Sequence, residues 1–202
     1  MRKMCENAVL FLDPHVVTKD RGAPWLDCRD NYEWYYTYGF AYQPRSLLEV
    51  GVRFGYSAIS ICTGCSVPPN LVVLVDDGRD EPEGLEHAKT CLDGLFPAIN
   101  VITHAWDTQK LDFGLVIEGR PFDMIHIDAD HRPDAVRHDF EFFWPFLKSG
   151  GMMILDDMRS LAGERCVPLM FHVLPWLMDR QDVRILNFVN NYNCQLLVEK
   201  GP

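Results

Sequence analysis

The feature that most constrains the fold is a series of short segments, apolar on both faces, that alternate with amphipathic helical patterns. Strands of this kind, linked by helices, are typical of a parallel sheet that helices cover on both sides. We therefore expect an α/β fold with a doubly wound, mostly parallel sheet. The pattern predicts strands at residues 45–51, 71–77, 99–103, 122–128 and 150–157, and helices at 54–64, 82–96 and 133–148.

The C-terminal region is predicted to add an antiparallel element to this sheet. A helix is expected at residues 163–178, followed by strands at 182–189 and 194–200. The turn-rich tetrapeptide NNYN joins the two strands. Because so short a connection suits neighbouring antiparallel strands, we expect a hairpin. The expected sheet therefore has seven strands and ends in an antiparallel C-terminal hairpin.

The first 44 residues are expected to form a helical or lid segment in front of a core at residues 45–202. The stretch DNYEWYYTYGFAY at 30–42 is predicted as an aromatic helix over the first strand, after irregular chain. Together with Trp25, these aromatic side chains either help to form a lid or an acceptor pocket, or serve only for packing. Their abundance also leads us to expect a homodimer.

Length and charge limit the class of protein. A chain of 202 residues with 48% hydrophobic residues is long enough for one well-packed domain and short for two, so a single domain at 1–202 is expected. The formal net charge of -10 opposes binding to nucleic acid, whose phosphates attract Lys and Arg. A neutral or cationic small molecule suits this charge better. We find no membrane-spanning run or signal peptide, and expect a cytoplasmic protein.

The seven cysteines lie at irregular spacings, which suits reduced, mostly buried thiols better than a disulfide framework. Cys62 and Cys65 have CxxC spacing, but no second pair completes a zinc ribbon. We interpret the pair as packed thiols, with a redox role as the alternative.

The turn after the first strand is rich in glycine. Gly51 and Gly55 allow a tight turn and a close approach by a ligand, and Tyr56 and Ser57 begin the next helix, where backbone amides are free to donate hydrogen bonds. A dinucleotide fold needs GxGxxG to hold a pyrophosphate. Arg53 replaces the second glycine of that pattern, so a phosphate ligand is disfavoured.

Two acids flank the glycine turn and indicate a ligand with positive charge. Glu49 stands inside the first strand, and Asp76 ends the second, where an acid would accept hydrogen bonds from ribose hydroxyls. Alone, either acid is explained as a solvated strand end or a helix cap. Together in one βαβ unit, they favour S-adenosylmethionine, which carries an amino group and a sulfonium.

Two segments of the chain resemble a known family. The segment LLEVGVRFGYSAIS is similar to the first motif of class I S-adenosylmethionine-dependent methyltransferases, and in particular of the catechol and caffeoyl-CoA O-methyltransferases. FDMIHIDADH followed by LKSGGMMILDD resembles the same group, and its double Asp resembles the macrolide-sugar O-methyltransferases. The resemblance covers about residues 45–160. It implies a Rossmann-like methyltransferase sheet.

Acidic residues follow two strands that are expected to be neighbours. Asp128 and Asp156 each close a strand, and adjacent parallel strands lie about 4.8 Å apart. Their carboxylates can share Mg²⁺, which takes oxygen ligands at about 2.1 Å, with Mn²⁺ or Ca²⁺ as alternatives. The resemblance implies that Asp128, Asp156 and Asp157 are the metal ligands, although the plant and catechol enzymes usually have Asn in place of Asp157. The alternative is that these acids are solvated or cap helices.

Three further residues are considered for roles in catalysis, cofactor binding or core packing. A cation bound beside Asp128 would activate and orient a hydroxyl, and His131, where the resembled group has lysine, is our candidate general base. The alternative for His131 is a surface loop. Asp107 either accepts from the adenine amino group or caps a helix. His126 is expected to be a satisfied core residue.

We therefore expect a Mg²⁺-assisted O-methyltransferase that uses S-adenosylmethionine and acts on a hydroxyl of a small molecule such as a sugar, a phenol or a natural product. Two alternatives stay open: a nucleotide-dependent oxidoreductase, and a non-catalytic module that keeps the cofactor fold. A nucleic-acid methyltransferase is disfavoured by the acidity of the chain.

Overall fold

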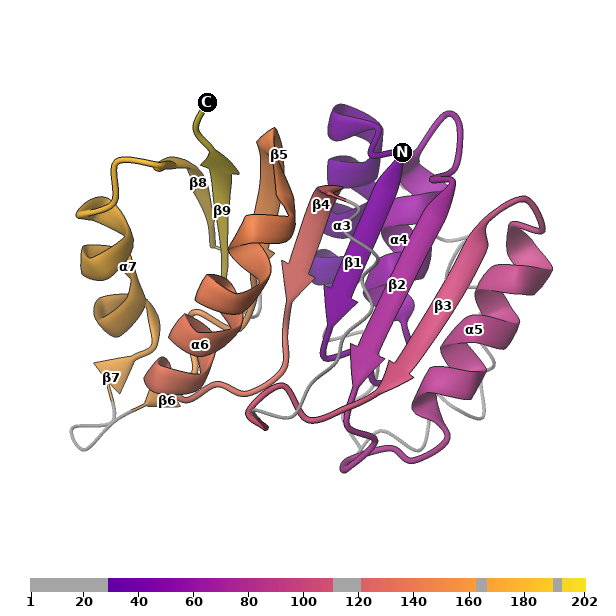
Figure 1. Ribbon diagram of the computed structural model, residues 1–202, viewed down its shortest axis with the longest axis horizontal. Coiled ribbons are helices and arrows are strands. Elements are labelled where there is room, and N and C mark those ends of the chain that lie inside the picture. The colour runs from indigo at the N-terminus through magenta and orange to yellow at the C-terminus, as the bar shows by residue number, and fades with distance from the viewer. Residues whose placement is uncertain (1–28, 111–120, 163–166, 191–193) are drawn as a thin grey trace.

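A seven-stranded sheet organises the chain (Figure 1), in a computed structural model that describes residues 29–110, 121–162, 167–190 and 194–202. The first five strands run parallel, and the last two are antiparallel to their neighbours, which confirms the predicted sheet and its hairpin. In spatial order the strands are β3 (Asn100–Ala105), β2 (Leu71–Asp76), β1 (Ser46–Val50), β4 (Phe122–Ile127), β5 (Leu147–Leu155), β9 (Gln195–Lys200) and β8 (Val183–Val189).

Helices cover both faces of the sheet, with α6 in front and α3 and α4 behind in Figure 1. Successive strand residues point to opposite faces, so Leu47 packs in one core cluster and Leu48 in the other. The first cluster includes residues of α3 (Arg29–Tyr42), α4 (Tyr56–Gly64) and α5 (Gly84–Leu95), and the second includes residues of α6 (Pro133–Phe143) and α7 (Met170–Met178). None of the described helices is long and apolar enough to cross a membrane.

The strand order reverses at β1, whose neighbours are β2 and β4. Backbone hydrogen bonds keep the carboxyl ends of the central strands level: the Gly51 amide donates to Val75 (2.9 Å), and the Asp128 amide donates to Val50 (2.8 Å). Ligands of open α/β sheets bind at such a reversal, outside the carboxyl ends of the strands. The fold therefore places the residues that follow β1, β2, β4 and β5 around one crevice.

The helix predicted at 133–148 is shorter in the structure, and the following strand is longer. Helix α6 ends at Phe143 and a short 3₁₀ turn (Trp144–Phe146) leads directly into β5. Pro145 explains the early end, because proline lacks the N–H that an α-helix needs. The glycines predicted to stop the helix lie within β5, where the pairing with β4 shifts between Met124 and Phe122 and Gly150 has a positive φ.

The helix predicted at 163–178 also begins later than expected. Helix α7 starts at Met170, after a two-stranded ladder of β6 (Leu161–Ala162) and β7 (Val167–Pro168). Pro168 disfavours a helical conformation at the residue before it, which accounts for the late start. Residues 163–166 lie outside the described residues.

The aromatic helix predicted at 30–42 is present as α3 and packs closely on α4. A Cβ atom at Gly39 would lie 2.0 Å from the Ile61 carbonyl oxygen, and one at Gly64 would lie 2.0 Å from that of Tyr36, so each helix needs a glycine for this contact. Trp25 and the irregular segment predicted before the helix lie outside the described residues.

The CxxC cysteines lie at the end of α4 and are free thiols. Burial raises the pKa of the Cys62 thiol, and it raises the pKa of Cys65 to about 11. Both thiols are therefore protonated at neutral pH, as the packed-thiol interpretation requires.

Candidate active site

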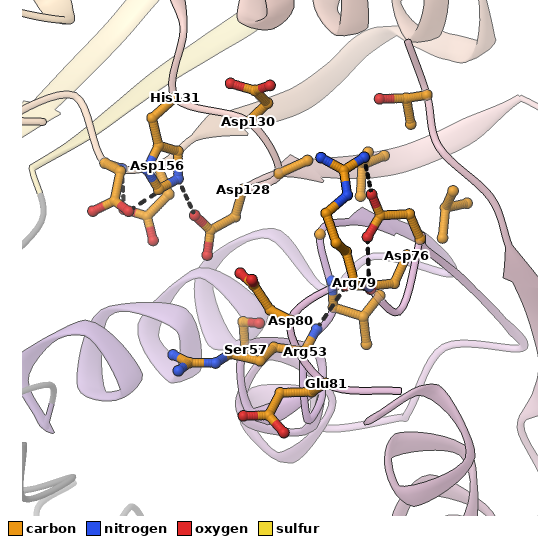
Figure 2. Close-up of a pocket in the computed structure, with 18 of the residues that line it drawn as sticks. Arg53, Ser57, Asp76, Arg79, Asp80, Glu81, Asp128, Asp130, His131 and Asp156 are labelled. Atoms are coloured by element: carbon orange, nitrogen blue, oxygen red, sulfur yellow. Dashed lines mark hydrogen bonds and ion pairs between the residues drawn. The ribbon is translucent and has the colours of Figure 1, made fainter. Parts of the chain in front are cut away.

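A cavity of about 620 Å³ opens at the carboxyl ends of β1, β2, β4 and β5. In Figure 2, Asp76 and Arg79 lie on one side of it and His131 and Asp156 on the other, with Asp128 between them. The cavity thus joins the glycine turn to the strand-end acids. Most of the residues singled out in the sequence line it: Gly51, Tyr56, Ser57, Asp76, Asp107, Asp128, His131, Asp156 and Asp157. Glu49 and Gly55 are absent from the lining.

The two glycines of the turn are required by backbone geometry and packing. Gly51 has a φ of 83°, and a Cβ atom there would lie 2.1 Å from the Asp128 carbonyl oxygen. Gly55, with a φ of 73°, precedes α4 and would bring a Cβ atom to 2.6 Å from that of Ala88. Gly51 therefore lets β1 and the loop after β4 meet, and Gly55 lets the turn rest on α5.

Asp76 fastens the glycine turn to the end of β2. Its Oδ2 accepts hydrogen bonds from the amides of Val52 (2.7 Å) and Arg53 (2.9 Å), and its Oδ1 accepts one from Gly78 (2.7 Å). A carboxylate offers about four acceptor positions, so one remains for a ligand hydroxyl. The contact with ribose stays a prediction.

Asp107 follows β3, and the described residues after it form a turn and not a helix. Its Oδ1 accepts a hydrogen bond from the amide of Gln109 (3.1 Å), as a capping residue would. Its Oδ2 lies 3.1 Å from Arg79 and 3.7 Å from Lys110, and the residue lines the cavity. The side chain is thus both a local turn element and accessible to a ligand.

Glu49 points away from the cavity and lies behind its wall. Its side chain is fully buried, and its Oε1 accepts hydrogen bonds from the Ser57 hydroxyl and from Nδ1 of His126 (2.9 Å). Among the described residues, Oε2 has no hydrogen-bond partner. Direct contact between Glu49 and a cofactor stays a prediction, whereas its contact with Ser57 is observed.

His126 is buried and hydrogen-bonded, as expected of a satisfied core residue. It faces Glu49 across adjacent strands, and its Nε2 lies 3.0 Å from the Tyr35 hydroxyl. Burial lowers the pKa of His126, but the hydrogen bond to Glu49 and that residue's charge outweigh burial and raise the pKa to about 9. Glu49 and His126 are therefore buried together as a hydrogen-bonded acid–imidazole pair.

The strand-end acids form two overlapping groups that share Asp128. One group joins Asp128, Asp156 and His126, and the other joins Asp128, Asp157 and His131, with the ligand atoms of each group within 4.8 Å of one another. Asp156 and Asp157 belong to different groups because the chain turns sharply between them, with a left-handed φ of 54° at Asp157. Neither of these two groups contains all three predicted metal ligands, and Asp128 is the acid that the two groups share.

These carboxylates disfavour one another's charge. Burial raises the pKa of Asp156, burial and the charge of Asp156 raise that of Asp128, and burial and the charge of Asp128 raise that of Asp157 to about 6. Hard oxygen donors gathered in this way fit Mg²⁺, Mn²⁺ or Ca²⁺, whose charge would relieve the repulsion.

His131 lies close to Asp128 and Asp157, the two acids of the second group. Its Nε2 is 3.1 Å from Asp157. It is also 3.5 Å from Asp128, which it faces in Figure 2. Burial lowers its pKa, but the neighbouring carboxylates of Asp128 and Asp157 raise it to about 9. The imidazole therefore carries a positive charge at neutral pH while it lies alone among these acids.

Helix α3 contributes to the cavity, in line with one of the two interpretations of its aromatic residues. Tyr32 and Tyr35 line the wall, and the Tyr35 hydroxyl donates a hydrogen bond to Asp156. The only sequence signal is the spacing of Tyr32, Tyr35 and Tyr38, which places them on one side of a helix. Nothing in that spacing identifies Asp156 as the partner.

Solved structures with a similar fold include methyltransferases. The O-methyltransferase TomG from Streptomyces achromogenes, involved in tomaymycin synthesis and solved with SAM, is 18% identical, with 98% of this chain and 90% of that chain covered and a TM-score of 0.67. An O-methyltransferase from Bacillus cereus in complex with SAH is 16% identical over 98% and 90%, with a TM-score of 0.66. A methyltransferase from Geobacter sulfurreducens is 18% identical over 99% and 89%, with a TM-score of 0.65.

No curated protein matches the sequence. A family model described as a methyltransferase domain matches residues 48–158, which is more than half of the 202 residues. The matched segment contains the glycine turn and all three strand-end acids. The resemblance found in the sequence is thus confirmed, and the chain belongs to this family of methyltransferase domains.

Proposed function

We propose that the protein is an S-adenosylmethionine-dependent, Mg²⁺-assisted O-methyltransferase that acts on a hydroxyl of a small molecule such as a sugar, a phenol or another natural product. The observation that carries this proposal is the single cavity that joins the glycine turn to the acids after β4 and β5. The SAM and SAH bound in the similar TomG and Bacillus cereus structures support the choice of cofactor.

The glycine-turn end would hold the methyl donor. Gly51 lets a ligand approach the backbone, and Tyr56 and Ser57 begin α4, whose first amides lack helical partners. The remaining acceptor position of Asp76 suits a ribose hydroxyl, and Asp107 suits the adenine amino group. We also assign Glu49 and Gly55 to this end: Glu49 through its contact with Ser57, and Gly55 through the packing of the turn.

The acidic end would hold the cation through Asp128, Asp156 and Asp157. A bound divalent cation lowers the pKa of a coordinated hydroxyl and fixes its position. A cation held there would offset the negative charges of Asp128 and Asp157, which raise the pKa of His131, and would leave its Nε2 able to accept the hydroxyl proton. Asp128, which belongs to both acid groups, would keep the acceptor oxygen close to His131.

Calorimetric titration with S-adenosylmethionine, with and without Mg²⁺, tests the proposal. We expect saturable binding of the cofactor, and turnover of a true acceptor that falls on Asp156→Ala and on His131→Ala. Failure of the wild-type protein to bind the cofactor in either condition would remove the enzyme proposal. Unchanged turnover in both variants would remove the metal mechanism and leave the cofactor proposal standing.

A further inference from the structure

A chain of buried polar side chains runs beneath the cavity from α4 to the end of β5. The Ser57 hydroxyl donates to Glu49, Glu49 contacts Nδ1 of His126 (2.9 Å), Nε2 of His126 contacts the Tyr35 hydroxyl (3.0 Å), and that hydroxyl donates to Asp156. The side chains from Glu49 to Asp156 are at most 3% exposed. The chain therefore joins the proposed cofactor end to the proposed cation end through the protein interior.

The direction of the hydrogen bond from Tyr35 to Asp156 determines the role of the neighbouring ring nitrogen of His126. Asp156 Oδ2 accepts from the Tyr35 hydroxyl, which leaves that hydroxyl oxygen as the acceptor for Nε2–H of His126. On its other side, Nδ1 of the same ring lies 2.9 Å from Oε1 of Glu49. Since a phenol has a single proton, the ring of His126 fixes which way the Tyr35 hydroxyl points.

The two oxygens of Asp156 are thereby held by two different donors. Oδ2 accepts from Tyr35, and Oδ1 accepts from the amide of Asp157 (2.9 Å). Held at both ends, the carboxylate cannot turn freely about its own axis, and its remaining acceptor positions keep a fixed direction. Groups that hydrogen-bond to a metal ligand in this way commonly influence the affinity of a metal site.

We propose that Tyr35 is a positioning residue that holds Asp156 ready for a divalent cation, with Glu49 and His126 orienting the tyrosine hydroxyl. The inference rests on the proposed cation-binding role of Asp156. It gives α3 a role at the acidic end, although this helix lies outside residues 48–158, the segment that matches the family.

The same helix supplies a matched control in Tyr38. Tyr38 is also buried, and its hydroxyl donates to a side chain, Oε1 of Gln195 (2.7 Å), but not to an acid of the site. Tyr35→Phe and Tyr38→Phe therefore each remove one buried hydroxyl from α3. Any general loss of stability should appear in both variants, whereas an effect through Asp156 should appear in the first alone.

The experiment is a titration of the full chain with Mn²⁺, in which free Mn²⁺ is followed by electron paramagnetic resonance and thermal unfolding is recorded for each variant. Tyr35→Phe should weaken Mn²⁺ binding about tenfold or more, and Tyr38→Phe should stay within about twofold of wild type. His126→Gln, which keeps the hydroxyl but replaces its rigid ring donor with a flexible amide that can either donate or accept, should fall between the two, and it decides the question if Tyr35→Phe does not fold.

Each other outcome overturns the inference in a recognisable way. If both Tyr35→Phe and His126→Gln bind Mn²⁺ like Tyr38→Phe, the hydrogen-bonded chain does not position the acid. Tighter binding in Tyr35→Phe would mean that the hydroxyl competes with the ion for Asp156. If the wild-type protein binds no Mn²⁺, the proposed metal mechanism fails, and the role of Tyr35 fails with it.

Discussion

The glycine-turn end and the acidic end of the cavity are both built on strand ends, yet they accommodate negative charge in opposite ways. At the glycine-turn end, three backbone amides donate to Asp76. At the acidic end, burial and mutual repulsion raise the pKa values of Asp128, Asp156 and Asp157. The Asp76 carboxylate is thus stabilised by the fold itself, whereas the three strand-end acids would gain stability from a positively charged ligand.

The largest effect should come from breaking the glycine-turn end. Gly51→Val places side-chain atoms against the Asp128 carbonyl in a left-handed backbone position, so we expect a loss of at least about 3 kcal/mol in the free energy of unfolding, measured in urea. Gly94→Ala is the matched control, because no atom lies within 4 Å of its added Cβ. That variant, in α5, should gain about 0.5 kcal/mol. Equal stability of Gly51→Val and wild type would refute the backbone argument.

The second largest effect should be a gain in the free energy of unfolding when a cation is added to the acidic end. Mn²⁺ at about 100 times its Kd should stabilise the wild-type protein by about 2–3 kcal/mol, because it binds only the folded site. A chelator should reverse the gain. Asp128→Asn should abolish it, since Asp128 belongs to both acid groups. An equal gain in Asp128→Asn, measured by thermal unfolding, would place the ion elsewhere.

Asp139 separates burial from mutual repulsion, with a smaller expected effect. It lies on α6, is fully buried, and accepts a hydrogen bond from Gln109 (3.0 Å). Burial raises its pKa to about 6, from 3.8 when exposed. The folded state therefore favours the protonated form of Asp139. The stability that the protein gains from this protonated form is fully present below about pH 4 and is lost as the pH rises through about 6.

Asp139→Asn should therefore stabilise the protein by about 1–2 kcal/mol at pH 8 and flatten the fall in stability between pH 4 and 6. Urea unfolding at several pH values measures both effects. The stability gained by Asp139→Asn should be the same with and without Mn²⁺, whereas the gain expected at the acidic end requires the ion. A variant less stable than wild type at pH 8 would show that the charged carboxylate is stabilised by its surroundings.

The two ends also differ in how much the sequence predicted. The convergence of Asp128 and Asp156 was predictable, because residues that follow neighbouring parallel strands must meet at one edge. The inward direction of Glu49 was not, because LLEV is packed on both faces and its pattern does not show which face adjoins the cavity. The contact of Tyr35 with Asp156 spans 121 residues, and it depends on how closely α3 approaches α4 through Gly39 and Gly64.

The same limits apply to the element boundaries. Apolar strands were located correctly because two-sided burial leaves a continuous signal, as in β1 and β2. The end of α6 was wrong because the apolar stripe continues past Phe143, and Pro145 decides where the helix stops. Local backbone chemistry outweighed periodicity there.

The central claim is that one cavity brings a methyl donor and a divalent cation together. A crystal soaked with S-adenosylmethionine and Mn²⁺ tests it most directly, because the anomalous signal of the ion can be located beside the cofactor. We predict a peak in contact with Asp128 and at least one of Asp156 and Asp157, with the cofactor lying along Gly51 and Ser57. A bound cofactor with no peak at these acids would contradict the account.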